Sequence, residues 1–143
     1  MSAEVVYLDT SAAVKLLMTE KESPALRRWL RRRPERASAA LLRVELVRVV
    51  RRAGLPRLIR EARRLVAGVH LIRLDDDLLD RAADLDPTDL RSLDSIHLAA
   101  AVSLGDDLAA VVSYDDRLLA AATSLGLPTA TPSRARPLLA VVG

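Results

Sequence analysis

The sequence predicts an α/β domain in which helices cover both faces of a central parallel sheet. Apolar runs that suit buried strands alternate with segments of helical periodicity. The clearest runs, VVYLD at 5–9 and AAVVSYD at 109–115, are continuously apolar up to their polar ends, as expected of strands buried on both faces. There is no internal repeat and no linker long enough to divide the 143 residues, so a single domain over residues 1–143 is expected.

The elements of the first half are marked by residues that begin or end helices. Ser23 suits a helix N-cap, with Pro24 at the first helical position. Gly54 suits the end of a helix, and Pro56 suits the start of the next one. The predicted elements are a strand at 4–8, helices at 11–18 and 23–33, a short strand at 36–40, and helices at 41–53 and 58–67.

The second half continues the alternation with similar boundary residues. Ser92 suits the cap of a helix that ends before Gly105, and Asp115 or Asp116 suits the cap of a helix that ends at Gly126. The predicted elements are a strand at 69–74, a helix from 75–77 to just before Pro87, a helix at 92–104, a strand at 109–115, a helix at 117–125 and an edge strand at 128–131.

Four acidic residues, Asp9, Glu45, Asp94 and Asp115, occupy structurally marked places in this pattern. Asp9 and Asp115 each follow an apolar run where a helical segment begins. Parallel strands end at the same edge of a sheet, and ligands of such folds bind there, so both carboxylates are expected at that edge. The order and spacing of the four acids point to a metal-dependent nuclease.

Each acid also has an ordinary structural explanation. Asp9 and Asp115 are suitable helix N-caps, and Asp94 falls in the first turn of its helix, where the dipole favours negative charge. Glu45 lies at the margin of an apolar helix face, three residues before Arg48, with which it can form a surface ion pair. The conjunction of all four acids in strand and helix context favours the functional interpretation.

Carboxylates that converge without a basic partner repel one another and raise their own pKa values. A divalent cation removes that repulsion, and oxygen ligands suit Mg²⁺ or Mn²⁺. Mg²⁺ takes one or two carboxylates directly and keeps several waters, so the remaining acids can orient water that attacks a phosphodiester. Three hydroxyl groups, from Thr10, Ser11 and Ser113, are placed to hold such water.

Composition and charge further limit the functions that this protein can have. Residues 23–64 are rich in arginine, whereas residues 75–116 are acidic, although the formal net charge is only +3. A basic face attracts polyanions, but arginine-rich helices are also often simply solvated. The absence of cysteine excludes disulfides and thiolate sites, and 2% aromatic residues disfavour a base-stacking platform. Without a leader-like segment or an apolar run of roughly 20 residues, a soluble cytoplasmic protein is expected.

These motifs resemble those of PIN-domain ribonucleases, specifically the VapC-type toxins of bacterial toxin–antitoxin pairs. The resemblance spans essentially the whole chain. It rests on YLDTSA around Asp9, the helical Glu45, LDSIHLAAA around Asp94, and VVSYDDRLLAAA around Asp115 followed by SLGL. Ser113 stands where the family commonly has threonine, which preserves the hydroxyl.

The resemblance implies a three-layer PIN-like fold and Mg²⁺-dependent cleavage of RNA. It implies that Asp9 and Asp94 are direct metal ligands, and that Glu45 and Asp115 complete the acidic pocket directly or through water. It also implies a homodimer and inhibition by a VapB-like antitoxin, whose C-terminal segment lies across the active-site groove.

Other functions are less consistent with the sequence. A haloacid-dehalogenase-like phosphatase needs an aspartate where Ser11 stands, and a receiver domain needs a late lysine, whereas the only lysines are Lys15 and Lys21. No phosphate-loop or dinucleotide fingerprint is present. A catalytically inactive PIN-like module that binds RNA or protein remains the alternative. His97, one helical turn after Asp94, suits either a packing role or a part as ligand or proton shuttle.

Overall fold

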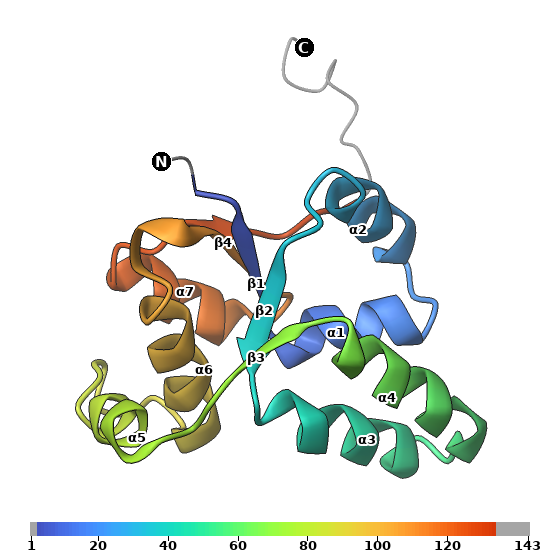
Figure 1. Ribbon diagram of the computed structural model, residues 1–143, viewed down its shortest axis with the longest axis horizontal. Helices are drawn as coiled ribbons and strands as arrows, with labels where there is room; N and C mark the ends of the chain where they lie inside the picture. The colour runs from blue at the N-terminus through green and yellow to red at the C-terminus, as the bar shows by residue number, and fades with distance from the viewer. Residues whose placement is uncertain (1–2, 134–143) are drawn as a thin grey trace, which may run out of the picture.

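The computed structural model describes residues 3–133 as a five-stranded parallel sheet covered by helices (Figure 1). The strands are β1 (Val5–Leu8), β2 (Arg36–Ala39), β3 (His70–Ile72), β4 (Leu108–Val112) and β5 (Thr129–Ala130). The helices are α1 (Thr10–Leu17), α2 (Ser23–Leu30), α3 (Leu42–Arg52), α4 (Ile59–Ala67), α5 (Asp76–Ala83), α6 (Ser92–Val102) and α7 (Asp116–Ser124). Two short 3₁₀ helices, η1 (Pro56–Leu58) and η2 (Gly105–Asp107), precede α4 and β4.

The strand order is β3-β2-β1-β4-β5, and every neighbouring pair is parallel. From β1 the chain builds outward to β2 and β3, then returns to the other side of β1 to add β4 and β5. The direction of winding therefore reverses between β1 and β4. In open parallel sheets such a reversal opens a crevice at the carboxyl ends of the two strands, which is the usual ligand position.

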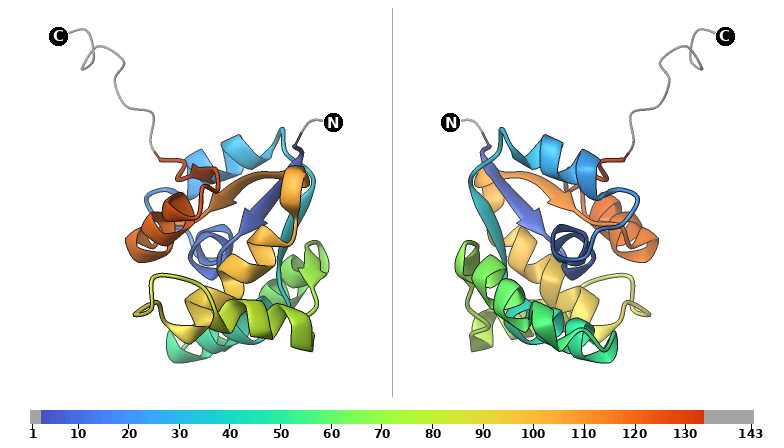
Figure 2. Two further views of the ribbon diagram at one scale, coloured as in Figure 1. Left: turned by 90° about the vertical axis from the view of Figure 1, so that its left-hand side faces the viewer. Right: turned by 90° about the vertical axis from the view of Figure 1, so that its right-hand side faces the viewer.

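Alternate residues of β1 face the two sides of the sheet and pack in separate cores. Val6 and Leu8 pack with α1 and α2, whereas Tyr7 packs with α6 and its neighbours. A third cluster joins α1 to α3 and α4. Helices α1 to α4 thus cover one face and α5 to α7 the other, as the further views show (Figure 2). The predicted three-layer α/β architecture is confirmed.

Several element boundaries differ from the sequence-based expectation. Ser23 and Ser92 are the first helical residues rather than caps; the caps are Glu22 and Arg91, which make no side-chain capping hydrogen bond. The Ser23 hydroxyl is buried and instead accepts a hydrogen bond from the Glu20 amide at 2.8 Å. Helix α2 stops at Leu30, before the predicted residue 33, because the chain turns ahead of Pro34.

The glycine positions agree with the prediction. Gly54, Gly105 and Gly126 follow α3, α6 and α7 and adopt φ values of +70°, +55° and +78°. Within residues 3–133, no helix has the length and apolar character needed to span a membrane.

Candidate active site

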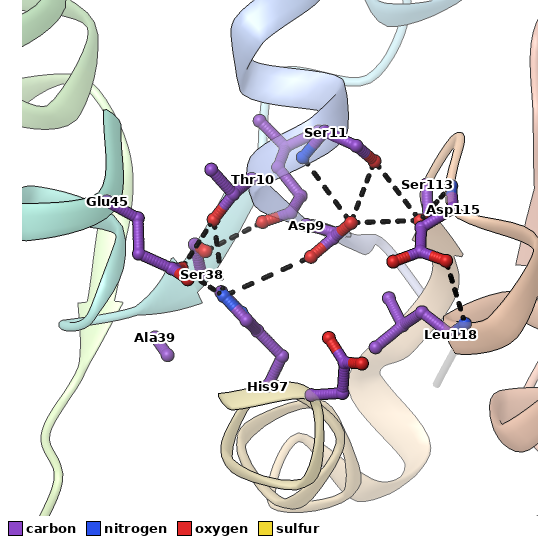
Figure 3. Close-up of polar contacts among 12 residues, drawn as sticks. Asp9, Thr10, Ser11, Ser38, Ala39, Glu45, His97, Ser113, Asp115 and Leu118 are labelled. Carbon is purple, nitrogen blue, oxygen red and sulfur yellow. Dashed lines mark hydrogen bonds and ion pairs between the residues drawn. The ribbon is translucent and has the colours of Figure 1, made fainter. Parts of the chain in front are cut away.

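The acidic residues singled out in the sequence come from four elements around the crevice between β1 and β4. Asp9 follows β1, and Asp115 lies three residues after the end of β4. Glu45 is in the first turn of α3, and Asp94 is in the first turn of α6. Figure 3 shows the side chains of Asp9, Glu45 and Asp115 at this edge of the sheet, together with His97.

Asp9 is held in one orientation by donors on a single oxygen. Its Oδ2 accepts hydrogen bonds from the Ser11 hydroxyl at 2.7 Å and the Ser113 hydroxyl at 2.9 Å, and a longer one from the Ser11 amide at 3.4 Å. The amide contact makes Asp9 the N-cap of α1. Its Oδ1 receives no hydrogen bond from residues 3–133 and lies 3.9 Å from His97 Nε2. Although Asp9 is only 6% exposed, one oxygen therefore remains available to a ligand.

The two serine hydroxyls fix the carboxyl ends of β1 and β4 relative to each other. Ser11 Oγ and Ser113 Oγ lie 3.2 Å apart, and they accept hydrogen bonds from the amides of Tyr114 and Asp115, respectively. Asp115 in turn caps α7, since its Oδ1 accepts the Arg117 amide at 2.9 Å. Its Oδ2 receives no hydrogen bond within the described range. Asp116 is the exposed first residue of α7, so Asp115 is the acid that faces Asp9.

Glu45 does not form the surface ion pair with Arg48 that its spacing allows. Its Oε1 accepts hydrogen bonds from the Thr10 hydroxyl at 2.6 Å and from His97 Nε2 at 2.7 Å. Burial favours the neutral carboxyl, but the hydrogen bonds from His97 and Thr10 outweigh it and hold the pKa of Glu45 below its ordinary value. Glu45 is thus kept ionised, with Oε2 free of donors from the described chain.

His97 is buried, and both of its ring nitrogens are engaged. Nδ1 lies 2.6 Å from the hydroxyl of Tyr7, which also accepts the Ala39 amide at 3.0 Å. Burial raises the pKa of Tyr7 far above its ordinary value, so the hydroxyl keeps its proton and donates a hydrogen bond to Nδ1. The imidazole proton is then on Nε2, which donates to Glu45. In this arrangement His97 is a hydrogen-bond donor to an acid and not a free metal ligand.

Asp94 is compensated only weakly, by Arg91 and His97. It receives no hydrogen bond from residues 3–133, and its nearest cation, Arg91, is 3.9 Å away on a side chain that is 66% exposed. Burial raises the pKa of Asp94, and the negative charges of Asp115 and Asp9 raise it further. Asp94 therefore lies close enough to Asp115 and Asp9 for their negative charges to disfavour its ionised form.

The donor set fits a hard divalent cation. Every one of the four carboxylates keeps at least one oxygen that no donor in residues 3–133 occupies, and the mutual repulsion is of the kind that a cation relieves. Among these residues, no group of three or more acidic, histidine or cysteine side chains is arranged to hold an ion directly. A hydrated Mg²⁺ takes only one or two carboxylates directly and reaches others through water, so it does not require such a group.

The sequence did not point to Tyr7, and it left the part of His97 undecided. Tyr7 lies in a continuously apolar run, so only its hydroxyl, in a strand buried on both faces, signalled a polar partner. Its partners are 32 and 90 residues away along the chain. Spacing within one element cannot reveal contacts of that kind.

Comparisons with known proteins identify the family. The PIN-domain family model matches residues 6–123. Among curated proteins of Mycobacterium tuberculosis, ribonuclease VapC46 is 47% identical over 135 residues, covering 90% of this chain and 98% of VapC46. Ribonuclease VapC47 is 42% identical over 136 residues, covering 92% of this chain and 100% of VapC47.

A solved structure has the same fold. The crystal structure of VapC20 from M. tuberculosis, described as a sarcin–ricin loop cleaving toxin, superposes with a TM-score of 0.70. It covers 89% of this chain and 99% of VapC20, at 17% sequence identity. At that identity the similarity establishes the fold alone, whereas the family model and the curated relatives establish membership. The chain belongs to the PIN-domain family and, within it, to the VapC ribonucleases.

Proposed function

We propose that this protein is a divalent-metal-dependent ribonuclease that acts as the toxin of a VapBC-type pair. The observation that carries the proposal is Asp94, a half-buried carboxylate without a hydrogen-bond donor in the described chain, whose pKa is raised by burial, Asp115 and Asp9. Such a centre suits a divalent cation. The relatives named ribonucleases supply the substrate class, which is RNA.

The residues have distinct roles in this proposal. Asp9, through Oδ1, and Asp94 are the direct ligands of Mg²⁺ or Mn²⁺, and Glu45 and Asp115 complete the site directly or through water. When bound, the cation acidifies water and stabilises negative charge on the phosphate. Hydrolysis then adds water across a P–O bond of the backbone and leaves one phosphate end and one hydroxyl end.

The surrounding side chains keep the acids ionised and oriented. Ser11 and Ser113 hold Asp9 by its Oδ2, so that Oδ1 is left for the cation. His97 and Thr10 donate to Glu45, which leaves its Oε2 free to accept a hydrogen bond from the attacking water. Tyr7 fixes the tautomer of His97 from the other side. In this account His97 and Tyr7 are positioning residues.

The partners also belong to the proposal. Membership of the VapC group supports a cognate VapB-like antitoxin, and we expect the toxin to form a homodimer. The alternative is a PIN-like module that binds RNA or a protein without cleaving. The same four acids are compatible with a binding role, so only an assay of cleavage separates the two.

The test is cleavage of total RNA by purified, antitoxin-free protein with Mg²⁺, with Mn²⁺ and with EDTA. The Asp9→Asn variant is the matched control for contaminating nucleases, because asparagine still suits the N-cap of α1. We expect discrete products that require the metal and are absent with Asp9→Asn. The same products with the variant, or no cleavage by the folded protein with either metal, would contradict the proposal.

A further inference from the structure

A pocket of about 300 Å³ adjoins the acidic centre and shares Asp94 with it. One wall is formed by Leu90 and Arg91, which lead into α6. The opposite wall is formed by α7, with Arg117 in its first turn and Ala120 one turn further on. Because Asp94 borders both spaces, a group in the pocket lies beside the bond on which the acids act.

The charges at the rim of the pocket favour an anionic occupant. Arg117 is exposed and forms no ion pair with any residue in the range 3–133. The Arg91 side chain is 66% exposed, and its Nε lies 3.9 Å from Asp94 Oδ2. Asp89 and Asp94 also line the pocket, so the formal charges of its lining balance. The cation that no carboxylate of residues 3–133 engages is Arg117, and the attraction for an anion rests on it. One guanidinium group can donate two parallel hydrogen bonds to the oxygens of a phosphate. Here the guanidinium groups lie at the edge of an acidic centre that by itself repels a polyanion.

The floor of the pocket is apolar. Pro87, Leu90, Ala120 and Ala121 contribute to the lining, and Ser124 adds a hydroxyl. No aromatic side chain is among the lining residues, so the pocket offers a flat apolar contact and no stacking platform. A volume near 300 Å³ is at the lower end of small-molecule sites. Arginines at the rim and an apolar floor together match the phosphate and the base or ribose of one nucleotide.

We propose that this pocket is a nucleotide subsite, which holds one residue of single-stranded RNA next to the cleaved phosphodiester. The subsite rests on the proposed ribonuclease function and extends it. Proteins recognise single-stranded RNA by its splayed-out bases, which can lie against an Arg guanidinium plane as well as an aromatic ring. Arg117 is the phosphate-binding cation of the subsite, because its charge is unpaired in the described chain and it lines the pocket from the first turn of α7.

The test is binding of a fluorescently labelled 12-nucleotide single-stranded RNA, followed by anisotropy in the uncleaving Asp9→Asn protein without metal. Arg117→Gln is expected to lower affinity about tenfold, as the loss of a charged hydrogen bond would. It should also reduce the slope of log affinity against log salt by about 0.7, as one lost phosphate contact would. Arg81→Gln is the matched control, because Arg81 carries the same charge outside the pocket, where it pairs with Asp77.

A second variant tests the shape of the pocket without changing its charge. Ala120→Leu narrows the pocket and is expected to lower RNA affinity severalfold while leaving the salt slope unchanged. Thermal unfolding of each variant checks that it is folded. The subsite would be overturned if neither Arg117→Gln nor Ala120→Leu changed the RNA affinity or the salt slope of the Asp9→Asn protein. The pocket would then be left to a protein ligand.

The two proposals can fail separately. Metal-dependent cleavage at the same bonds and rates by Arg117→Gln, in the otherwise native protein, would overturn the subsite and leave the ribonuclease intact. Binding of the RNA that depends on Arg117 and Ala120, in a protein that cleaves nothing with Mg²⁺ or Mn²⁺, would support the pocket and contradict the enzyme.

Discussion

His97 connects the hydrophobic core to the acidic centre. It is 2% exposed, yet its Nε2 is 2.7 Å from Glu45 Oε1. The side chain therefore cannot act by touching RNA in solvent, and its effect must pass through Glu45.

Substitution of His97 by asparagine or by glutamine distinguishes hydrogen-bond donation to Glu45 from simple packing. Glutamine can place a donor where Nε2 stands, whereas asparagine reaches only the Nδ1 position. We expect His97→Asn to lower kcat by about 10-fold to 100-fold, the usual loss when a group that orients a metal-site acid is removed. His97→Gln should retain more activity, with little change in the KM for RNA. Equal kinetic losses in the two variants, each shown to be folded, would contradict this role.

Asp94 is expected to destabilise the metal-free protein. Its folded-state pKa is raised, so the protein favours the protonated form and loses stability as the pH rises from the ordinary pKa through the raised one. Asp94→Asn removes the repulsion from Asp115 and Asp9. At pH 7 without divalent cations it should raise the melting temperature by about 1–3 °C, as relief of less than 1 kcal/mol would in a domain of this size.

The pH dependence of the stability difference between Asp94→Asn and the parent shows whether charge repulsion at Asp94 is its cause. The advantage of Asp94→Asn should be present above the raised pKa of Asp94 and disappear as the pH falls below the ordinary value, where the parent carboxyl is protonated. Differential scanning fluorimetry over this pH range, without metal, measures it. A variant less stable than the parent at pH 7 would show that Asp94 acts mainly by stabilising the N-terminus of α6.

Among the elements, Tyr7 joins two strands and a helix through one hydroxyl. It belongs to β1, accepts the Ala39 amide of β2 and donates to His97 of α6. Tyr7→Phe leaves a buried amide and a buried imidazole nitrogen without partners. We expect it to lower the free energy of unfolding by about 1–3 kcal/mol, which urea denaturation measures. A change of less than a few tenths of a kcal/mol would mean that water or a rearranged side chain replaces the hydroxyl.

The elements themselves were largely predictable from local sequence. Continuous apolar runs identified β1 and β4, and the glycines after α3, α6 and α7 marked chain reversals that require positive φ. The predicted caps Ser23 and Ser92 were wrong because serine favours the start of a helix in general. Which residue takes the cap depends on the exact backbone path into the helix. At Ser23 the hydroxyl accepts a hydrogen bond from the Glu20 amide, which precedes the helix, and so does not cap it.

The site was predictable only in part, for a related reason. Parallel strands bring their carboxyl ends together, so the positions of Asp9 and Asp115 followed from the pattern of the chain. The partners of Glu45 did not, since Thr10 and His97 are 35 and 52 residues away, whereas the expected partner Arg48 is three residues away. Sequence spacing reveals neighbours on one helix, and long-range hydrogen bonds need the fold.

Over the whole molecule, charge and apolar surface are unevenly distributed. Arginines line two hollows away from the acidic centre, one at the end of α2 and one between α3 and α4. Exposed apolar side chains include Val44, which borders the second hollow and is 57% exposed. These surfaces are available to macromolecular partners.

The assembly state is testable on the free protein. We expect a homodimer, with a mass twice the 15.6 kDa of one chain, by size-exclusion chromatography with light scattering. Shared burial of apolar surface would stabilise such a dimer. A monomer mass at all concentrations up to those used for cleavage assays would contradict the expectation.

We propose that four carboxylates from distant parts of the chain act as one divalent-cation site. Titration of the purified protein with Mn²⁺, with free ion measured by electron paramagnetic resonance, tests it directly. Asp9→Asn and Asp94→Asn are the test variants, and Asp106→Asn on η2 is the control, because this exposed acid lies at the opposite end of β4. We expect saturable binding by the parent and the control, and binding at least tenfold weaker in both test variants. Equal Mn²⁺ affinity in all four proteins, or no binding by the folded parent, would contradict it.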